Sequence, residues 1–390
     1  MELAEFDELY NQKESFEPVN VKPGEMSPRE RFFAIMDFKK IDRIIDTEFG
    51  YWKDTLRRWH SEGLPSWVDN NEKADVFFGF DVWKKQIPAN TNIDPVFQEE
   101  ILEQNAGHTI KYDQSRVKCE VFTNGADTIP HYLDFPIKDF STWQPFKERL
   151  KPDAPKRLHA DLKALQKILQ KRNYILCAGG GSTAGIIRNW MGFEGICMGI
   201  YDQPDLLDDM LAALAEVSAS LAGEITAYID VDLVAWWEDI AFKTGPIVTP
   251  SFFIDKCGPV YKKVMDIYRS KGTRFSYVDC DGDFRTLLAG WMNNGVNIMF
   301  PLEVASGIHP ENLRRDHPGM RMMGGFDKML LLQGKNEIRT ELKRLKKITD
   351  EGGYIPHVDH RVQADVPYGI YLYYLECKRD LFGLTGKTPV

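Results

Sequence analysis

The feature that most constrains the fold is a regular alternation of short apolar runs and amphipathic segments, which begins near residue 155. Residues 157–172 carry leucines at spacings of four, three and four, a pattern that predicts a helix. Residues 173–181 then form a short apolar run that enters a glycine-rich turn. This strand-then-helix order recurs at least six times, and it predicts a parallel sheet whose faces are covered by helices.

Strands that continue this alternation can be located along the whole sequence. Residues 41–50 form a candidate near the start, which brings the expected number of strands close to eight. We therefore expect an α/β fold, a (β/α)8 TIM barrel, and an open doubly wound sheet is the alternative. The strands predicted after the first unit lie at 231–239, 273–283, 296–303, 319–327 and 354–360.

The sequence before the barrel is predicted to be a polar N-terminal lead-in over residues 1–27. A helix is expected to begin at Pro28, because Ser27 is suited to be its N-cap and Glu30 completes a capping box. From there on, residues 28–390 are expected to form a single barrel domain.

One part of this domain departs from the alternation, at about residues 75–145. Residues 108–125 alternate polar and apolar side chains and predict a β-hairpin with its turn near Asp113. We therefore expect an inserted excursion at this point of the barrel.

Composition narrows the function classes. The net charge of -9 excludes a nucleic-acid partner, which requires a basic surface to displace counterions. The six cysteines form no closely spaced pair, so reduced thiols in a cytoplasmic protein are expected. The acidic N-terminus has no apolar core of a signal peptide, and no apolar run of 18 residues predicts a membrane span. The sequence leaves the oligomeric state open, a homodimer included.

The carboxyl ends of the strands of a barrel meet at one mouth, where such enzymes keep their active sites. The strand ends here supply carboxylates, a thiol and an imidazole, which together are typical of a zinc site. For Asp281 and Asp283 the alternative is a turn and a helix cap, and Cys280 alone is more often a buried core residue. The residues at the strand ends are Trp237, Glu238, Asp279, Cys280, Glu303, His357 and Asp359.

A glycine-rich turn follows the strand at 173–181. Gly180, Gly181 and Ser182 would let the backbone approach a ligand, and exposed amides in such a turn suit an anion. The turn lacks the spacing of a dinucleotide-binding motif or of a P-loop. Close packing of strand on helix is the structural alternative.

Several motifs together resemble the uroporphyrinogen decarboxylase-like superfamily, over residues 27 to 382. They are PRERFFAIMDFKKIDRI near the start, GGGSTAG followed by MGFEG, WWEDIAFKTGPIVTPSFF, the strand that ends in DCDGD, and PLEVASGIHPENL. The resemblance implies a (β/α)8 barrel, in agreement with the alternation of strands and helices.

Two segments of the sequence distinguish between the branches of this superfamily. True decarboxylases carry an arginine-rich FMRQAGR segment, which is missing from DTEFGYWKDTLRRW here. Corrinoid-linked methyltransferases bind zinc through His-x-Cys on one strand and Cys on the last strand. Cys280 matches the first thiol, Val278 replaces the histidine, and His357 in PHVDH is the counterpart on the last strand. The resemblance therefore implies zinc held by Glu238, Cys280 and His357.

This branch implies an O-demethylase component. A methyl group would pass from a small methoxylated aromatic compound to a Co(I) corrinoid, with the cobalamin supplied by a carrier protein and zinc acting as Lewis acid. Trp237 and Tyr354 are expected to contact the substrate. Two alternatives remain, a metal-free decarboxylase or lyase and a non-catalytic tetrapyrrole-binding protein. The residues expected to act in catalysis are Asp279, Glu303 and Asp359, and the lyase would use Asp279, Asp281 and His357 as acid and base.

Overall fold

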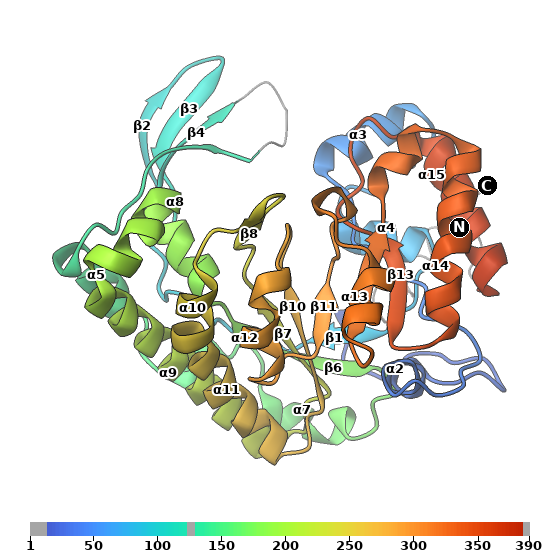
Figure 1. Cartoon of the computed structure of the whole chain (residues 1–390), viewed down its shortest axis with the longest axis horizontal. Helices are drawn as coiled ribbons and strands as arrows, with labels where there is room; N and C mark the ends of the chain where they lie inside the picture. Colours follow the sequence, from blue (N-terminus) through green and yellow to red (C-terminus); the bar gives the residue numbers. More distant parts are fainter. Residues whose placement is uncertain (1–13, 123–128, 385–390) are drawn as a thin grey trace. The chain divides into compact units, whose positions relative to one another are not determined.

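Residues 14–122 and 129–384 are described by the computed structural model, and the chain forms two compact units (Figure 1). Unit 1 is built from three segments, Met1–Gln86, Lys163–Cys177 and Ile298–Val390. Unit 2 is built from two segments, Ile87–Leu162 and Ala178–Asn297. Residues 1–13 of the predicted lead-in lie outside the described residues. The predicted domain boundaries stay a prediction.

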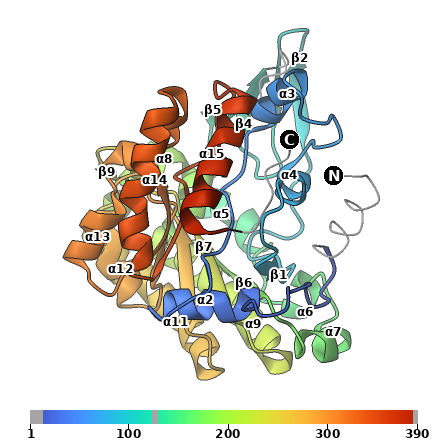
Figure 2. The same cartoon turned by 90° about the vertical axis from the view of Figure 1, so that its right-hand side faces the viewer.

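Parallel strands form the centre of unit 1. β11 (Ile298–Phe300) pairs with β12 (Arg321–Phe326), and β12 pairs with β13 (Tyr354–Val358). β1 (Lys84–Gln86) pairs with the first residues of β6 (Ile175–Gly181). Helices α14 and α15 pack against each other, as Figure 2 also shows. The helices of unit 1 are α2 (Pro28–Met36), α3 (Lys53–Ser61), α4 (Asn71–Phe77), α7 (Leu162–Leu169, which starts at the unit boundary), α13 (Pro310–Asp316), α14 (Lys335–Asp350) and α15 (Tyr368–Phe382).

The start of α2 confirms the capping box predicted from the sequence. The Ser27 side chain accepts a hydrogen bond from the Glu30 amide, and the Glu30 carboxylate accepts the Ser27 amide at 2.8 Å. The cap satisfies amides that the first turn of a helix leaves unpaired.

The prediction of a strand at residues 41–50 is wrong. The segment is extended but forms no regular ladder, and only Tyr51 makes an isolated parallel bridge, to Val362. The Glu48 side chain takes the place of a neighbouring strand, because its Oε2 accepts the amide of Val358 at 3.1 Å. A side chain thus completes a backbone hydrogen bond that a ladder would have made.

Unit 2 contains a second set of parallel strands and the longest helices. β7 (Leu233–Trp237) pairs with β10 (Phe275–Asp279). Helix α9 packs against α11 and α8, and Figure 1 shows α9 and α11 side by side. The helices of unit 2 are α5 (Phe140–Lys147), α6 (Ala154–Arg157), α8 (Ala184–Asp202), α9 (Pro204–Tyr228), α10 (Pro250–Phe252), α11 (Gly258–Ser270) and α12 (Leu288–Met292). A short hairpin is formed by two strands of two residues each, β8 (Ala241–Phe242) and β9 (Gly245–Pro246).

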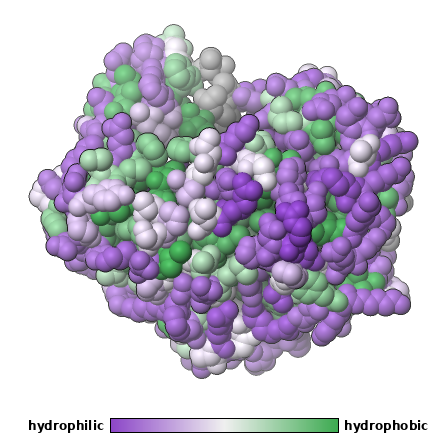
Figure 3. Space-filling model, viewed as in Figure 1, coloured by the Kyte–Doolittle hydropathy of each residue, from purple (hydrophilic) through white to green (hydrophobic). Residues whose placement is uncertain are grey.

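The predicted excursion forms an antiparallel sheet of four strands in unit 2, β2 (Glu100–Gln104), β3 (His108–Tyr112), β4 (Lys118–Phe122) and β5 (His131–Asp134). The predicted hairpin is confirmed, since Asp113 caps the β3–β4 turn by accepting the amides of residues 115 and 117. Residues 123–125 of the predicted hairpin lie outside the described residues. Both polar and apolar side chains cover this sheet, at the upper left of Figure 3.

The predicted fold class is confirmed at the level of an α/β fold with parallel strands. Seven strands belong to the parallel part, and residues 14–122 and 129–384 contain no eighth. A closed (β/α)8 barrel therefore stays a prediction.

One helix in the described ranges, α9 (Pro204–Tyr228), is long and apolar enough to cross a membrane. More than half of its most apolar window is buried inside the protein, as in the core helix of a globular unit. Its packing on α8 and α11 accounts for this composition.

Candidate functional site

The ends of β7 and β10 bring several predicted residues together in unit 2. The strands pair with Asp279 opposite Trp237, and the Glu238 amide donates to the Asp279 carbonyl at 2.9 Å. Cys280 follows directly. The predicted grouping of these strand ends therefore exists within unit 2.

Glu238 is fully buried and accepts four hydrogen bonds. Oε1 accepts the amide and hydroxyl of Thr183, at 2.7 and 2.8 Å, and the Tyr261 hydroxyl. Oε2 accepts the Gly185 amide at 2.7 Å. Burial raises the pKa of this carboxyl, and the hydrogen bonds oppose that shift. The arrangement caps the first turn of α8, where a carboxylate is favoured.

Cys280 is also buried, with 1% of its surface exposed. Its thiol donates to the Asp281 carbonyl at 3.4 Å. Burial, together with the nearby carboxylates of Asp239, Glu238 and Asp281, raises the pKa of the thiol well above its usual value. Without a metal ion Cys280 is therefore protonated at neutral pH, and binding of a metal there would release this proton.

Asp283, in the turn after Cys280, has a structural role, which was the alternative to metal binding in the sequence analysis. Asp283 accepts the Arg285 amide at 3.2 Å and forms two hydrogen bonds with the guanidinium of the same residue. Gly282 has φ +81°, and a Cβ there would lie 2.4 Å from the Ala241 carbonyl oxygen, so only glycine fits this turn.

The glycine-rich turn is shaped by packing within unit 2. A Cβ at Gly180 would lie 2.4 Å from Trp236, and one at Gly181 would lie 2.7 Å from Ser218 Oγ. The Ser182 hydroxyl accepts the Ile186 amide at 2.9 Å and so caps α8. These contacts explain the residue types without a ligand, and the predicted anion-binding role stays a prediction.

Arg188 is a residue that the sequence analysis missed, and it lies beside Trp237. Its guanidinium is 5.8 Å from the centre of the indole ring and 3.6 Å from the Asp239 carboxylate. A cation over an aromatic face suits a planar, negatively charged group. Arg188 belongs to α8 and Trp237 to β7, and no sequence pattern predicts that these two residues are in contact.

His357 lies in unit 1, at the carboxyl end of β13, and is 3% exposed. Burial lowers the pKa of its imidazole to about 3, so the ring is neutral at physiological pH. Nδ1 is 2.7 Å from the Val358 carbonyl oxygen, which fixes the proton on Nδ1. In the part of the chain that the structure describes, Nε2 makes no hydrogen bond.

Aromatic rings surround His357 within unit 1. The Phe300 and Phe49 rings are centred 5.4 and 6.5 Å from the imidazole. Phe49 also stacks on Phe300 and on His360, each at 5.0 Å, and Trp52 lies 5.8 Å from His360. We call Phe49, Trp52, Phe300, His357 and His360 the aromatic cluster. The sequence analysis gave Phe49 and Trp52 no chemical role.

Two predicted acids of unit 1 are linked through Lys328. Asp359 is fully buried and accepts the amides of Val304 and Lys328, at 2.9 and 3.1 Å. The Lys328 ammonium lies 3.5 Å from the Glu303 carboxylate. Burial raises the pKa of Asp359 to about 6, so this carboxyl exchanges a proton near neutral pH.

Tyr354 does not have the exposure that the predicted contact with substrate requires. It is the first residue of β13, fully buried, and its hydroxyl donates to the Gly324 carbonyl at 2.5 Å. The ring packs in the core at the amino end of the strand, away from the carboxyl end that carries His357.

Neither unit by itself fits the zinc site implied by the resemblance. In the described ranges, no group of three or more His, Cys, Asp or Glu side chains is arranged to hold a metal ion. The oxygens of Glu238 are already bonded, Cys280 is in unit 2, and His357 is in unit 1. Zinc therefore stays a prediction, and no step below depends on it.

Comparisons with known proteins give a family and a structural relative. The family described as uroporphyrinogen decarboxylase (URO-D) matches residues 121–375. A solved structure described as a methyltransferase from Methanosarcina mazei aligns with a TM-score of 0.56 at 13% identity. The alignment covers 92% of this chain and 99% of the other, which shows a shared fold. No curated protein matches the sequence.

Proposed function

Because the chain belongs to the uroporphyrinogen decarboxylase (URO-D) family, we propose that it is a methyltransferase with the fold of this family. The substrate is a small methoxylated aromatic compound, and the methyl acceptor is a corrinoid on a carrier protein. The structural relative from Methanosarcina mazei, itself described as a methyltransferase, supports the proposal.

The observation that carries the proposal is the aromatic cluster around a neutral His357. Phe300 and His360 both stack on Phe49, and an aromatic environment of this kind favours a planar substrate, since offset stacking of aromatic rings is favourable. His357 Nε2 can accept a hydrogen bond from a ring hydroxyl without introducing charge. Both features suit an uncharged ring that must be oriented in an apolar site.

Asp359 supplies the proton that this reaction consumes. When the methyl–oxygen bond breaks, the methyl group passes to the acceptor and the bonding pair stays on the phenoxide oxygen. A carboxyl with a pKa of about 6 is partly protonated near neutral pH and can protonate that oxygen. Asp359 lies two residues after His357, directly after the end of β13.

Methyl transfer from methoxyphenols to Co(I) cobalamin tests the proposal. We expect the purified protein to form methylcobalamin, followed by its visible absorbance, and His357→Gln to slow the reaction by about 100-fold or more. His131→Gln changes an exposed histidine of β5 and is the matched control. Absence of methylcobalamin with the wild type for every methoxylated substrate contradicts the proposal.

Metal analysis tests the zinc prediction separately. If zinc is bound through Cys280, plasma mass spectrometry will find about one zinc per chain in the wild type and a loss in Cys280→Ala. A wild-type chain without zinc after supplementation makes that prediction wrong and leaves the methyltransferase assay unaffected.

A metal-free lyase or decarboxylase is the second candidate function. It is favoured by the position of Asp359, whose pKa is about 6, two residues after the neutral His357. An acid and a base at one strand end suit proton transfer to and from carbon. Release of CO2 from aromatic carboxylates without methyl transfer would select this function. Cobalamin binding that survives Cys280→Ala and His357→Gln, with no turnover of either kind, would select the non-catalytic tetrapyrrole-binding protein.

A further inference from the structure

We propose that Arg361 determines substrate specificity by binding an acidic substituent of the aromatic substrate. The inference rests on the proposed function and deepens it, because it narrows the substrate class to methoxylated aromatic acids. Arg361 belongs to unit 1 and directly follows His360 of the aromatic cluster. The sequence analysis gave Arg361 no role.

The side chain of Arg361 is held in place by Trp52. Its guanidinium carbon lies 5.2 Å from the centre of the indole ring, so the planar cation is held against an aromatic face. The backbones on both sides are joined as well. The Val362 amide donates to the Gly50 carbonyl at 3.0 Å, and the Trp52 amide donates to the Val362 carbonyl at 3.4 Å. The position of the guanidinium is therefore set before a ligand binds.

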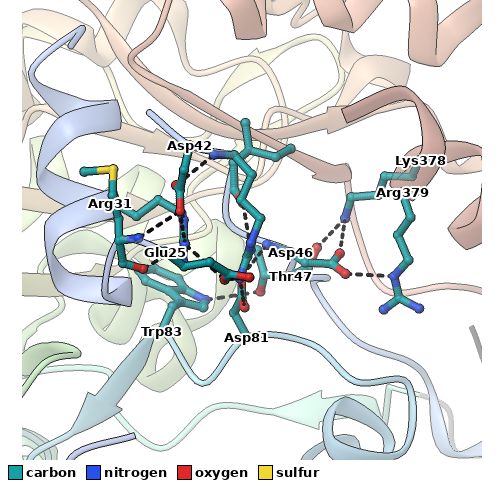
Figure 4. Close-up of polar contacts among 12 residues, drawn as sticks. Glu25, Arg31, Asp42, Asp46, Thr47, Asp81, Trp83, Lys378 and Arg379 are labelled. Atoms are coloured by element: carbon teal, nitrogen blue, oxygen red, sulfur yellow. Dashed lines mark hydrogen bonds and ion pairs between the residues drawn. The ribbon is translucent and has the colours of Figure 1, made fainter. Parts of the chain in front are cut away.

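The hydrogen-bond donors of Arg361 are not used by the folded chain. Its guanidinium makes no hydrogen bond and no ion pair with any residue in the described part of the chain. Two other arginines of unit 1 are paired, as Figure 4 shows. Arg31 donates to both oxygens of Asp42, at 2.9 and 2.7 Å. Arg379 donates to Asp46 at 2.8 Å. Since a guanidinium carries five N–H donors, those of Arg361 remain available to an acceptor from outside the chain.

This side of the aromatic cluster is accessible from solvent. Arg361, Trp52 and His360 are each partly exposed, whereas His357 is only 3% exposed. The free donors therefore belong to a side chain that a ligand can reach, and not to a charge enclosed in the core.

A row of aromatic rings connects Arg361 with His357. The Trp52 ring is centred 5.8 Å from His360, which stacks on Phe49 at 5.0 Å. The Phe49 ring in turn is centred 6.5 Å from His357. A substrate that lies along this row has its uncharged ring in an aromatic environment and its charged substituent at the end where Arg361 lies.

A carboxylate is the substituent that suits Arg361 best. It is planar, and its two oxygens match the paired N–H donors of a guanidinium, as in the pair of Arg31 with Asp42. It also leaves the ring itself uncharged, in agreement with the apolar surroundings of His357. A primary amide has a similar shape, but it offers one acceptor oxygen and no charge.

Isothermal titration calorimetry of the full chain, without cobalamin, tests the proposal. The probes are vanillate, homovanillate and dihydroferulate, in which the carboxylate stands progressively further from the ring, and the primary amide of each acid. With the wild type we expect at least one acid to bind at least about tenfold more tightly than its amide, because hydrogen bonds between charged groups are the stronger ones.

Variants of Arg361 test whether this residue causes the preference. The ratio of acid to amide affinity should fall to about one in Arg361→Gln and stay intermediate in Arg361→Lys, which keeps the charge without the planar fork of donors. Neither change removes a hydrogen bond within the described part of the chain, so both variants should fold, as thermal denaturation can verify. Arg315→Gln changes an exposed arginine of α13 and is the matched control, with an unchanged ratio.

Three outcomes overturn the proposal. Equal affinity of the wild type for every acid and its amide means that the guanidinium only covers the Trp52 ring. A preference for the acid that survives in Arg361→Gln places the carboxylate elsewhere. If neither acids nor amides bind at millimolar concentration, the role of Arg361 fails together with the aromatic site.

Guaiacol, a methoxyphenol without a carboxylate, separates this proposal from the proposed function. Demethylation of guaiacol without a preference for acids would overturn only the role of Arg361. Binding of acids that depends on Arg361, without methyl transfer from any of these compounds, would support the role of Arg361 and contradict the proposed function.

Discussion

The two units bury carboxylates in different ways. In unit 1, Lys378 is fully buried and donates to Glu48 at 2.6 Å, and Arg379 donates to Asp46 at 2.8 Å. In unit 2, Glu238 has four neutral hydrogen-bond donors, from Thr183, Gly185 and Tyr261. Ion pairs thus surround the buried carboxylates of Asp46 and Glu48 in unit 1, whereas neutral donors surround that of Glu238 in unit 2.

The difference shows how much each unit depends on a single partner. A buried ion pair gives little net stability, yet loss of one member leaves an uncompensated charge. A carboxylate with several neutral donors shares its stabilisation among them, so loss of one donor is tolerated. Unit 1 should therefore be sensitive to single changes of charge, and unit 2 to changes of packing.

The largest effect is expected for Lys378→Met. The change leaves Glu48 and Asp46 buried without this cation, and we expect a loss of about 3–5 kcal/mol in the free energy of unfolding, measured by urea denaturation. Lys346→Met is the control, because its ion pair with Asp350 is exposed and should contribute about 0–1 kcal/mol. A loss below that of the control would remove the proposed contrast between the units.

The pH dependence of stability sharpens the comparison through Asp359, a buried acid of unit 1 held by two amides. Its pKa rises from 3.8 to about 6 on folding, so between these values the folded chain binds more protons than the unfolded one. This contribution to stability therefore falls as the pH rises through that interval, by up to about 3 kcal/mol. Asp359→Asn should abolish the fall while lowering stability at every pH, because its amide N–H then faces a backbone N–H.

His357 contributes to the pH dependence with the opposite sign. Its pKa falls from 6.5 to about 3 on folding, so the unfolded chain binds more protons in that interval and this stability is lost as the pH falls. Urea denaturation at several pH values should thus show a steeper acid loss in Asp359→Asn than in the wild type. Equal slopes in both proteins would contradict the two assignments.

A change of packing near Glu238 is expected to have an intermediate effect on stability. Gly180→Ala places a methyl group 2.4 Å from Trp236, which itself packs 4.5 Å from Tyr261. We expect a loss of about 1–3 kcal/mol and a change in tryptophan fluorescence. Gly179→Ala is the matched control, since its nearest atom lies at 3.7 Å. An equal loss in both variants would mean that the indole contact does not matter.

The smallest effect is expected for Tyr261→Phe. The change removes one of the four hydrogen bonds to Glu238 and leaves the ring in place, so we expect a loss of about 1 kcal/mol. A loss as large as that of Lys378→Met would show that Glu238 depends on one donor after all, and the contrast between the units would fail.

Most local signals were read correctly from the sequence, and the strand predicted at residues 41–50 is the exception. The capping box at Ser27 and the hairpin turn at Asp113 depend on residues within four positions of each other, and both are present. The parallel strands follow from apolar runs that local patterns also reveal.

Features that depend on distant residues were missed. Phe49 reaches the aromatic cluster, and Lys328 joins Glu303 to Asp359, only through tertiary contacts. Tyr354 was assigned to the substrate because its strand was recognised, but its place at the amino end of that strand decides its burial. The close approach of Gly180 to Trp236 was also missed, because no local pattern connects the two residues.

The three-segment composition of unit 1 has a consequence for protein synthesis. Glu48 meets Lys378, and the Tyr51 and Tyr371 hydroxyls are 2.5 Å apart, so partners more than 300 positions apart in the sequence must find each other. On the ribosome, the segment with Glu48 and Tyr51 emerges more than 300 residues before its partners in α15 and has to wait for them. Both segments of unit 2 lie between these partners in the sequence, so unit 2 is fully translated before α15. A nascent chain that stalls before residue 368 would therefore expose Asp46 and Glu48 beside apolar surface, the state in which chaperones would be needed most.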